Sequence, residues 1–352
     1  MLLEGLNRRK AINLLDHLPI GHFMLQRPSC YSAANNQAML NSQRIFVDAI
    51  KRYCAAHGIA IELHAEGWLV VMQRGEKRFL AFGYDLGLNS ALAHRIAHDK
   101  SATADVLAMC GVSCVPHALF MNPQLKSQIP ARGSWEAMLA LLERHRRGVV
   151  IKPNEGTAGQ CVFLASTRSA LERAVNRIFS AHASLSISPY LEIEEEVRVV
   201  LLDGIPLAVY GKHRPAVVGD GERSLLELAL ASLPAEQQSK LLPGMLADFD
   251  HCALKTIVPP GERRVLNWRH NLESGAWPSI LEKGPTRDAC VGLAVNAARA
   301  INIRFASIDA VRVAGSWQVL EVNSAVMMEA LGRLHPELVY AAYGAALDKV
   351  FG

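Results

Sequence analysis

The sequence SIDAVRVAGSWQVLEVNS, residues 307–324, predicts two short strands joined by a tight turn. Each strand carries one acid among apolar residues, Asp309 in the first and Glu321 in the second. Residues two apart on a strand project from the same face, so Glu321 and Asn323 point together, and a hairpin can bring Asp309 to that face. Two carboxylates and an amide oxygen suit Mg²⁺ shared with substrate phosphates. Taken alone, the pattern is explained equally well by Asp and Asn at ordinary strand ends.

Length and composition favour a chain of two or three lobes. It has 352 residues, of which 50% are hydrophobic and 20% charged, which is ample for a buried core. The net charge is only +4 and the Lys and Arg residues are dispersed, so no nucleic-acid groove is expected. The sequence has no signal-peptide pattern and no apolar run of membrane-spanning length, which predicts a cytoplasmic protein without a membrane partner. The seven scattered cysteines are expected to be reduced and mostly buried.

Hydrophobic periodicity predicts alternating helices and strands. Helices are expected at 42–57, 100–110, 134–146 and from about 167, where Ser169 and Glu172 have capping-box spacing. Strands are expected at 59–63, 68–72, 78–82, 115–120, 148–152, 197–202 and 206–210, with a break at 186–191. Gly111 is placed to end the second helix. This alternation predicts the α/β (α+β) class, with a cleft between lobes.

A second candidate site follows the strand at 149–152. Lys152 ends that strand, a loop with Gly156 and Gly159 follows, and another apolar strand begins near Cys161. Glycines let backbone N–H groups approach phosphate oxygens, and a lysine adds a point charge. The segment is neither a Walker A motif nor a dinucleotide-binding fingerprint, because no helix opens after the loop. By itself it is better explained as an ordinary hairpin with an exposed lysine.

A third candidate is the segment SPYLEIEEE, residues 188–196. An aromatic residue between lobes, followed by an acid that enters a strand, can hold adenine and a ribose hydroxyl. A solvated acidic loop explains its four glutamates equally well.

These elements, in this order, resemble the ATP-grasp superfamily: Asp99-Lys100, the Lys152 loop, the segment ending at Glu196, and the hairpin with Asp309 and Glu321. The resemblance covers residues 94–350. Within it, KHRPAVVGDGERSLLEL at 212–228 is similar to a segment of cyanophycin synthetases and bifunctional glutathione synthetases. NWRHNLESG at 267–275 is similar to a segment of the glutamate ligases that modify a ribosomal protein. Both groups join a carboxylate to an amine at the expense of ATP.

The resemblance implies an ATP-grasp fold of three lobes, with the nucleotide between the second and the third. The lobes are residues 1–98 for substrate, 99–187 with the glycine loop, and 188–352 with the metal site. Lys100 and Lys152 would bind the α- and β-phosphates of ATP.

The remaining site residues fall into groups that the resemblance also implies. The loop closing over the phosphates would contain Gly156, Thr157 and Gly159. Adenine would be held by Ser188, Tyr190 and Leu191, and the ribose by Glu196. Two Mg²⁺ ions, for which Mn²⁺ can substitute, would be bound by Asp309, Glu321 and Asn323. The catalytic set would be Arg214, Arg269 and Asn271, whose arginines neutralise the transferred phosphoryl group and the substrate carboxylate.

The expected function is therefore an ATP-dependent carboxylate–amine ligase of the acid–amino-acid class. It would act through an acylphosphate on an amino acid or small peptide, in small-metabolite or peptide natural-product biosynthesis. A kinase on the same fold, phosphorylating a hydroxylated metabolite, and a non-catalytic nucleotide-binding module are the alternatives. A small carboxylate and an amine are the expected partners, and the resemblance adds a homodimer. The chain departs from the family pattern at Ser188, where relatives often carry an acid, and after Asn323, where many continue with Pro-Gly.

Overall fold

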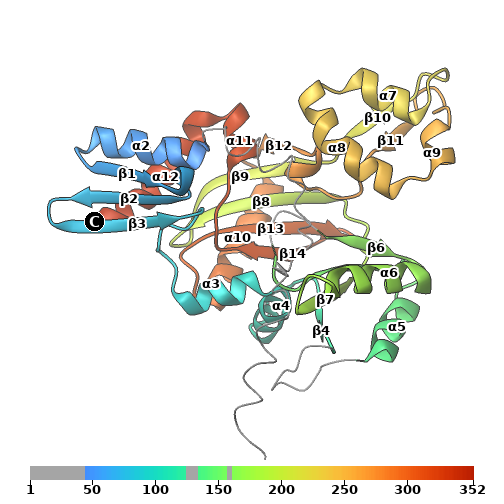
Figure 1. Ribbon diagram of the computed structural model, residues 1–352, viewed down its shortest axis with the longest axis horizontal. Coiled ribbons are helices and arrows are strands. Elements are labelled where there is room, and N and C mark those ends of the chain that lie inside the picture. Colours follow the sequence, from blue (N-terminus) through green and yellow to red (C-terminus); the bar gives the residue numbers. More distant parts are fainter. Residues whose placement is uncertain (1–43, 124–133, 157–160) are drawn as a thin grey trace, which may run out of the picture.

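The computed structural model describes residues 44–123, 134–156 and 161–352, and its secondary structure is mixed α/β (Figure 1). Strands in these residues form four separate sheets, of three, five, four and two strands. All pairings between neighbouring strands of these sheets are antiparallel. The α/β (α+β) class predicted from the sequence is confirmed. None of the described helices combines the length and apolarity needed to cross a bilayer.

The three-stranded sheet packs with helices from both ends of the described chain. Its strands are β1 (Ala60–His64), β2 (Leu69–Arg74) and β3 (Lys77–Phe82), with η1 (Ala65–Gly67) between the first two. Its helices are α2 (Ile45–Ala56), α11 (Glu329–Leu334) and α12 (Pro336–Phe351). Phe46 of α2 meets Tyr343 of α12 edge to face, with ring centroids 5.1 Å apart. The C-terminal helix therefore returns to complete the core of the first lobe (Figure 1).

The five-stranded sheet is the centre of the molecule, and its strand order is β12-β9-β8-β13-β14. The strands are β8 (Glu195–Leu202), β9 (Ile205–His213), β12 (Trp277–Ile280), β13 (Phe305–Val313) and β14 (Ser316–Asn323). One face packs against α3 (Ala91–His98), α4 (Lys100–Met109) and α10 (Pro285–Ile301).

The opposite face of this sheet is apolar at one end and polar at the other. At one end Val200, Leu202 and Phe305 join the core of the first lobe. Side chains alternate between faces of a strand, so the same face continues from Phe305 to Ser307 and Asp309 along β13. The apolar end anchors the sheet, and the polar end carries the candidate site.

The four-stranded sheet has the order β4-β7-β5-β6, with α5 and α6 packed on it. Its elements are β4 (Ala118–Met121), α5 (Trp135–Arg144), β5 (Val149–Pro153), β6 (Phe163–Ala165), α6 (Arg168–Phe179) and β7 (Ser184–Pro189). The two-stranded sheet and its helices form a smaller unit near the upper right of Figure 1. Its elements are β10 (Ala216–Val218), α7 (Leu225–Ser232), α8 (Ala235–Asp248), α9 (His251–Lys255) and β11 (Arg263–Val265), and η2 (Leu272–Ser274) follows.

Local sequence explains two elements that position the site. The Asp99 side chain caps α4 by accepting a hydrogen bond from the Ala102 backbone N–H at 2.8 Å, which holds Lys100 at the first turn. The turn between β13 and β14 has positive φ at Ala314 and Gly315, the geometry that two-residue hairpin turns require. The hairpin predicted at 307–324 is confirmed.

Three expectations from the sequence were wrong. Thr167, not Ser169, caps α6, and the Ser169 hydroxyl instead accepts a hydrogen bond from Arg173 inside the helix. The break expected at 186–191 is largely strand, because β7 runs to Pro189 and pairs on both sides. Of the six described cysteines, only Cys54 and Cys290 are buried.

Candidate active site

The hairpin of β13 and β14 brings together the acids that the sequence singled out. Ser307 lies opposite Asn323 and Asp309 lies opposite Glu321, and a bulge directly after the Asp309–Glu321 pair leaves Leu320 without a partner residue. On its other side β13 pairs with β8, where Arg198 lies opposite Asp309. One face of three neighbouring strands therefore carries a row of charged side chains.

Asp309 is the centre of this row and is almost completely buried. Its two oxygens accept hydrogen bonds from Arg198 Nε and Nη2, both at 2.7 Å, and Oδ2 lies 3.2 Å from Lys212 Nζ. Burial alone would raise the pKa of Asp309, but the charges and hydrogen bonds of Arg198 and Lys212 outweigh it and hold the pKa well below its usual range. Asp309 is therefore ionised throughout the neutral range.

Glu196 belongs to the same cluster. Lys212 also donates to Glu196 Oε1, and His270 Nδ1 lies 3.4 Å from Glu196 Oε2. Burial lowers the pKa of His270 to about 3, and the nearby Arg214 and Lys212 charges add to this, so the imidazole is neutral at pH 7. Glu196, predicted to bind ribose, is thus already bonded to a lysine, and its ribose role stays a prediction.

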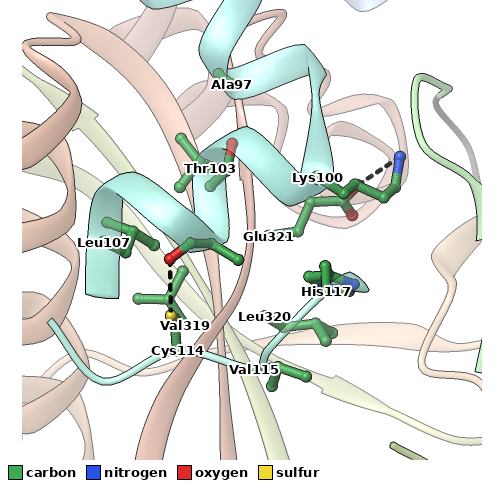
Figure 2. Close-up of a pocket in the computed structure, with 12 residues that line it drawn as sticks. Ala97, Lys100, Thr103, Leu107, Cys114, Val115, His117, Val319, Leu320 and Glu321 are labelled. Atoms are coloured by element: carbon green, nitrogen blue, oxygen red, sulfur yellow. Dashed lines mark hydrogen bonds and ion pairs between the residues drawn. The ribbon is translucent and has the colours of Figure 1, made fainter. Parts of the chain in front are cut away.

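Lys100 connects the four-stranded sheet to this cluster (Figure 2). Its Nζ donates to the Gly156 carbonyl at 2.9 Å and lies 3.6 Å from Glu321 Oε1. The Asn154 carbonyl and side chain accept hydrogen bonds, both at 3.1 Å, from the backbone N–H groups of Lys100 and Ser101. The start of the glycine loop is therefore fixed to the first turn of α4. The predicted loop residues Thr157 and Gly159 lie outside the described residues.

Lys152 reaches the same region from the end of β5. It is buried, and its ammonium makes no hydrogen bond or ion pair with any residue that the structure describes. Burial lowers the pKa of Lys152 to about 8; the charge of Glu321 opposes this shift and that of Lys100 adds to it. A buried cation without a direct partner is stabilised by an anion that enters the site.

The balance of charge favours a bound anion. Four cations, Lys100, Lys152, Arg198 and Lys212, face three carboxylates, Glu196, Asp309 and Glu321. Both neighbouring histidines, His117 and His270, have pKa values lowered first by burial, so they are neutral at pH 7. The cluster carries one excess positive charge.

The predicted adenine segment lies against a second aromatic residue. Ser188 is buried at the end of β7, and the Tyr190 backbone N–H donates to the Gly148 carbonyl at 3.0 Å. The Tyr190 ring meets the Trp268 ring edge to face, with centroids 5.7 Å apart. Trp268 was not singled out from the sequence, and its pairing with Tyr190 joins the segment at 188–191 to the one at 267–275.

Two of the three predicted catalytic residues, Arg269 and Asn271, are hydrogen-bonded elsewhere in this structure. Arg269 donates to Asp248 at 2.5 Å and to the Val162 carbonyl at 2.8 Å, and its guanidinium carbon lies 4.4 Å from the centre of the Trp268 ring. Asn271 caps η2 by accepting a hydrogen bond from the Glu273 backbone N–H at 2.9 Å. Arg214 acts electrostatically on His270 and Glu192. The catalytic roles of these three residues stay predictions.

The donor set fits a divalent cation that is shared with a ligand. In the described part of the chain, no three His, Cys, Asp or Glu side chains converge as a metal-binding group. Asp309 and Glu321 lie opposite each other, and the buried side-chain nitrogen of Asn323 and hydroxyl of Ser307 make no hydrogen bond with any residue that the structure describes. Mg²⁺ usually takes only one or two carboxylates and completes its shell with water and phosphate oxygens. At Asp309 it would compete with Lys212.

Comparison with known proteins found likenesses in structure only. No protein-family model matches this sequence, and no curated protein is similar to it at a significant level. The bifunctional glutathione synthetase from Pasteurella multocida aligns over 86% of this chain and 44% of its own, with 19% identity and a TM-score of 0.47. The D-alanine–D-alanine ligase from Bacillus anthracis aligns over 75% of this chain and 72% of its own, with 14% identity and a TM-score of 0.47. D-cycloserine synthetase DcsG aligns over 73% of this chain and 71% of its own, with 18% identity and a TM-score of 0.44.

This chain spans less than half the length of that glutathione synthetase. At these identities and TM-scores, its activity has to be inferred from its own residues. Sequence reasoning found Lys100, Lys152, Asp309 and Glu321, which the structure brings to one cluster. It missed Arg198 and Lys212, for which the sequence offers no motif and only their positions on β8 and β9 could have indicated a role. Arg198 follows Glu196 by two residues on the same face of β8, and Lys212 lies near the end of β9.

Proposed function

We propose that this chain is an ATP- and Mg²⁺-dependent ligase that joins a carboxylate to an amine through an acylphosphate. One observation carries the proposal. The buried Lys152 of the four-stranded sheet interacts electrostatically with Glu321, Glu196 and Asp309 of the five-stranded sheet, next to Lys100. Phosphate-binding cations and metal-binding carboxylates at one place between two sheets are what phosphoryl transfer requires.

The nucleotide phosphates would bind between Lys100 and Lys152, where the excess positive charge is concentrated. Adenine would lie near Ser188, Tyr190 and Leu191, with Trp268 as an additional aromatic neighbour. Asp309, Glu321 and Asn323 would hold Mg²⁺, which would neutralise the negative charge that develops on the transferred phosphoryl group. Arg198 holds Asp309 in place through two hydrogen bonds.

The chemistry explains why no nucleophilic side chain is needed. A carboxylate is a poor acyl donor, and transfer of the γ-phosphoryl group from ATP gives an acylphosphate and ADP. The amine then attacks the acyl carbon, loses a proton and expels phosphate, which forms the amide. Side chains of this chain contribute by positioning both substrates and by stabilising negative charge. Beside Asp309, the described cations that can do so are Arg198 at 2.7 Å and Lys212 at 3.2 Å.

Product analysis tests the proposal against the alternatives. The protein is incubated with Mg-ATP and with amino acids and small peptides, singly and in pairs, and the products are weighed by mass spectrometry. The proposal predicts ADP and phosphate, and a product whose mass is the sum of two substrates minus water. A phosphorylated product from one hydroxylated substrate would replace the ligase with a kinase. ATP binding without turnover under any pairing would favour a non-catalytic module.

Three expectations remain proposals. The first is the division into lobes at residues 1–98, 99–187 and 188–352, in which α11 and α12 of the last lobe pack with the helix and strands of the first. A homodimer and a cytoplasmic location are expected from the sequence and its resemblance.

A further inference from the structure

His117 lies directly before β4 and is a buried histidine that the proposed chemistry leaves unused. Only 8% of it is exposed, and its ring interacts with the Leu320 backbone, but neither imidazole nitrogen makes a hydrogen bond of ordinary geometry with any described residue. A buried polar group without a partner costs free energy, so such a histidine calls for an explanation. A leucine or methionine would fill the same space at no such cost.

The surroundings of His117 belong to the proposed nucleotide site. A small cavity is lined by His117, Lys100, Glu321 and the bulged residue Leu320, and Figure 2 shows the imidazole beside Glu321 and below Lys100. The charges of Lys152 and Lys100 both act on the ring. Three separate elements thus bring their polar groups to one point: the first turn of α4, the end of β5 and the start of β4.

Burial, reinforced by the charges of Lys152 and Lys100, holds the pKa of His117 well below its usual range. An imidazole presents at least one N–H donor in either protonation state. An N–H donor near two lysines complements an anion with several oxygens, because it adds a hydrogen bond to the attraction of both ammonium groups. A phosphoryl group meets this description.

We propose that His117 is a third phosphate-binding side chain, whose imidazole N–H donates to a nucleotide phosphoryl oxygen held between Lys100 and Lys152. This rests on the proposed function, since it assumes that nucleotide phosphates occupy that place. In this role His117 increases the affinity for the phosphates of the nucleotide and does not affect the binding of adenine.

Calorimetric binding of ADP and of adenosine tests the role, with His117→Leu and His117→Gln as variants. A hydrogen bond to a charged group is lost in His117→Leu, so we expect ADP to bind about 10- to 100-fold more weakly, and adenosine within about twofold of the wild type. Glutamine keeps an N–H donor and should restore most of the ADP affinity. Leu107→Ala is the matched control, because Leu107 lines the same cavity but offers no hydrogen bond. It should leave the ADP affinity nearly unchanged.

Two results would overturn the role of His117. One is that His117→Leu binds ADP as tightly as the wild type while Lys152→Ala binds ADP more weakly. That result would support the nucleotide site and exclude His117 from it. The other is an equal loss for ADP and adenosine, which indicates a structural effect. Unchanged ADP binding in Lys152→Ala as well would instead refute the proposed nucleotide site.

A measurement on the wild-type protein covers the case in which His117→Leu does not fold. The ¹⁵N-labelled histidine side chains are observed by NMR, with His117 assigned from the spectrum of His117→Gln. The proposal predicts that its imidazole N–H becomes protected from solvent exchange and shifts when ADP binds, but not when adenosine binds. An imidazole signal that ADP leaves unchanged would contradict it.

Discussion

Replacing Asp309 with Asn removes the negative charge from the centre of the buried cluster while keeping its shape. Arg198 and Lys212 then lose the carboxylate that both of them contact, at 2.7 and 3.2 Å. Removing one partner of a buried ion pair costs about 3–5 kcal/mol. Glu196 still pairs with Lys212, so we expect the lower end of that range. At about 1–2 °C per kcal/mol for a chain of this length, this lowers Tm by about 3–6 °C. Turnover should be lost as well, because Asp309 is a proposed metal ligand.

Glu321→Gln is the matched comparison for this prediction. Glu321 is partly exposed, and its ion pair within the described residues is with Lys100, at 3.6 Å. Such pairs contribute about 0–1 kcal/mol, so Tm should fall by less than about 2 °C while turnover is again lost. Thermal unfolding followed by circular dichroism and ADP release with Mg-ATP measure the two effects separately. Full activity in either variant would refute the metal assignment, and an unchanged Tm in Asp309→Asn would refute the energetic role of the buried cluster.

The pH dependence gives a second check on Asp309. Burial raises its pKa, but Arg198 and Lys212 together bring the pKa below the ordinary value of 3.8. A carboxyl group with a lowered pKa stabilises the fold above its unfolded pKa and loses that contribution as the pH falls. The Tm difference between wild type and Asp309→Asn should therefore be constant from about pH 8 to about pH 5 and shrink below about pH 4. A difference that grows on acidification would contradict this reasoning.

Lys152→Ala should weaken ADP binding at least about tenfold through the lost charged contact. In the wild type, calorimetry should show that ADP affinity falls above pH 8, because burial lowers the pKa of Lys152 to about 8 and the lysine then loses its charge. An ADP affinity in Lys152→Ala equal to that of the wild type would refute the phosphate role. Cys161→Ser should keep the rate of ADP release within about twofold, since acylphosphate formation needs no thiol, and a large loss would reveal a working one. Gly219→Ala should destabilise by about 2 kcal/mol or more, because its Cβ would lie 2.1 Å from the Pro259 carbonyl oxygen. An unchanged denaturation midpoint would show that the loop yields.

Elements with strong local signals could be predicted from the sequence. The hairpin of β13 and β14 combines alternating apolar residues with a turn that accepts positive φ at Ala314 and Gly315. β7 gave no such signal, since its serines and Pro189 are poor strand formers, and it is a strand because β4 and β5 pair on both sides of it. At α6, the capping-box spacing of Ser169 and Glu172 pointed to the wrong residue, because the backbone is extended at Thr167 and already helical at Ser169.

The site was predictable only as far as its residues lie in short motifs. Lys100, Lys152, Asp309 and Glu321 each stand in a recognisable local pattern. Arg198 owes its place to the pairing of β8 with β13, which are 111 residues apart at the Arg198–Asp309 contact. That strand order is a tertiary property with no local signature in the sequence.

Oxygen transfer from substrate carboxylate to phosphate tests the central claim most directly. The protein is incubated with Mg-ATP, an amine acceptor and a pool of amino acids labelled with ¹⁸O in both carboxylate oxygens, and the released phosphate is examined by ³¹P NMR. An acylphosphate route predicts phosphate that carries one ¹⁸O atom, because the amine displaces phosphate together with a former carboxylate oxygen. Turnover that releases only unlabelled phosphate would contradict it.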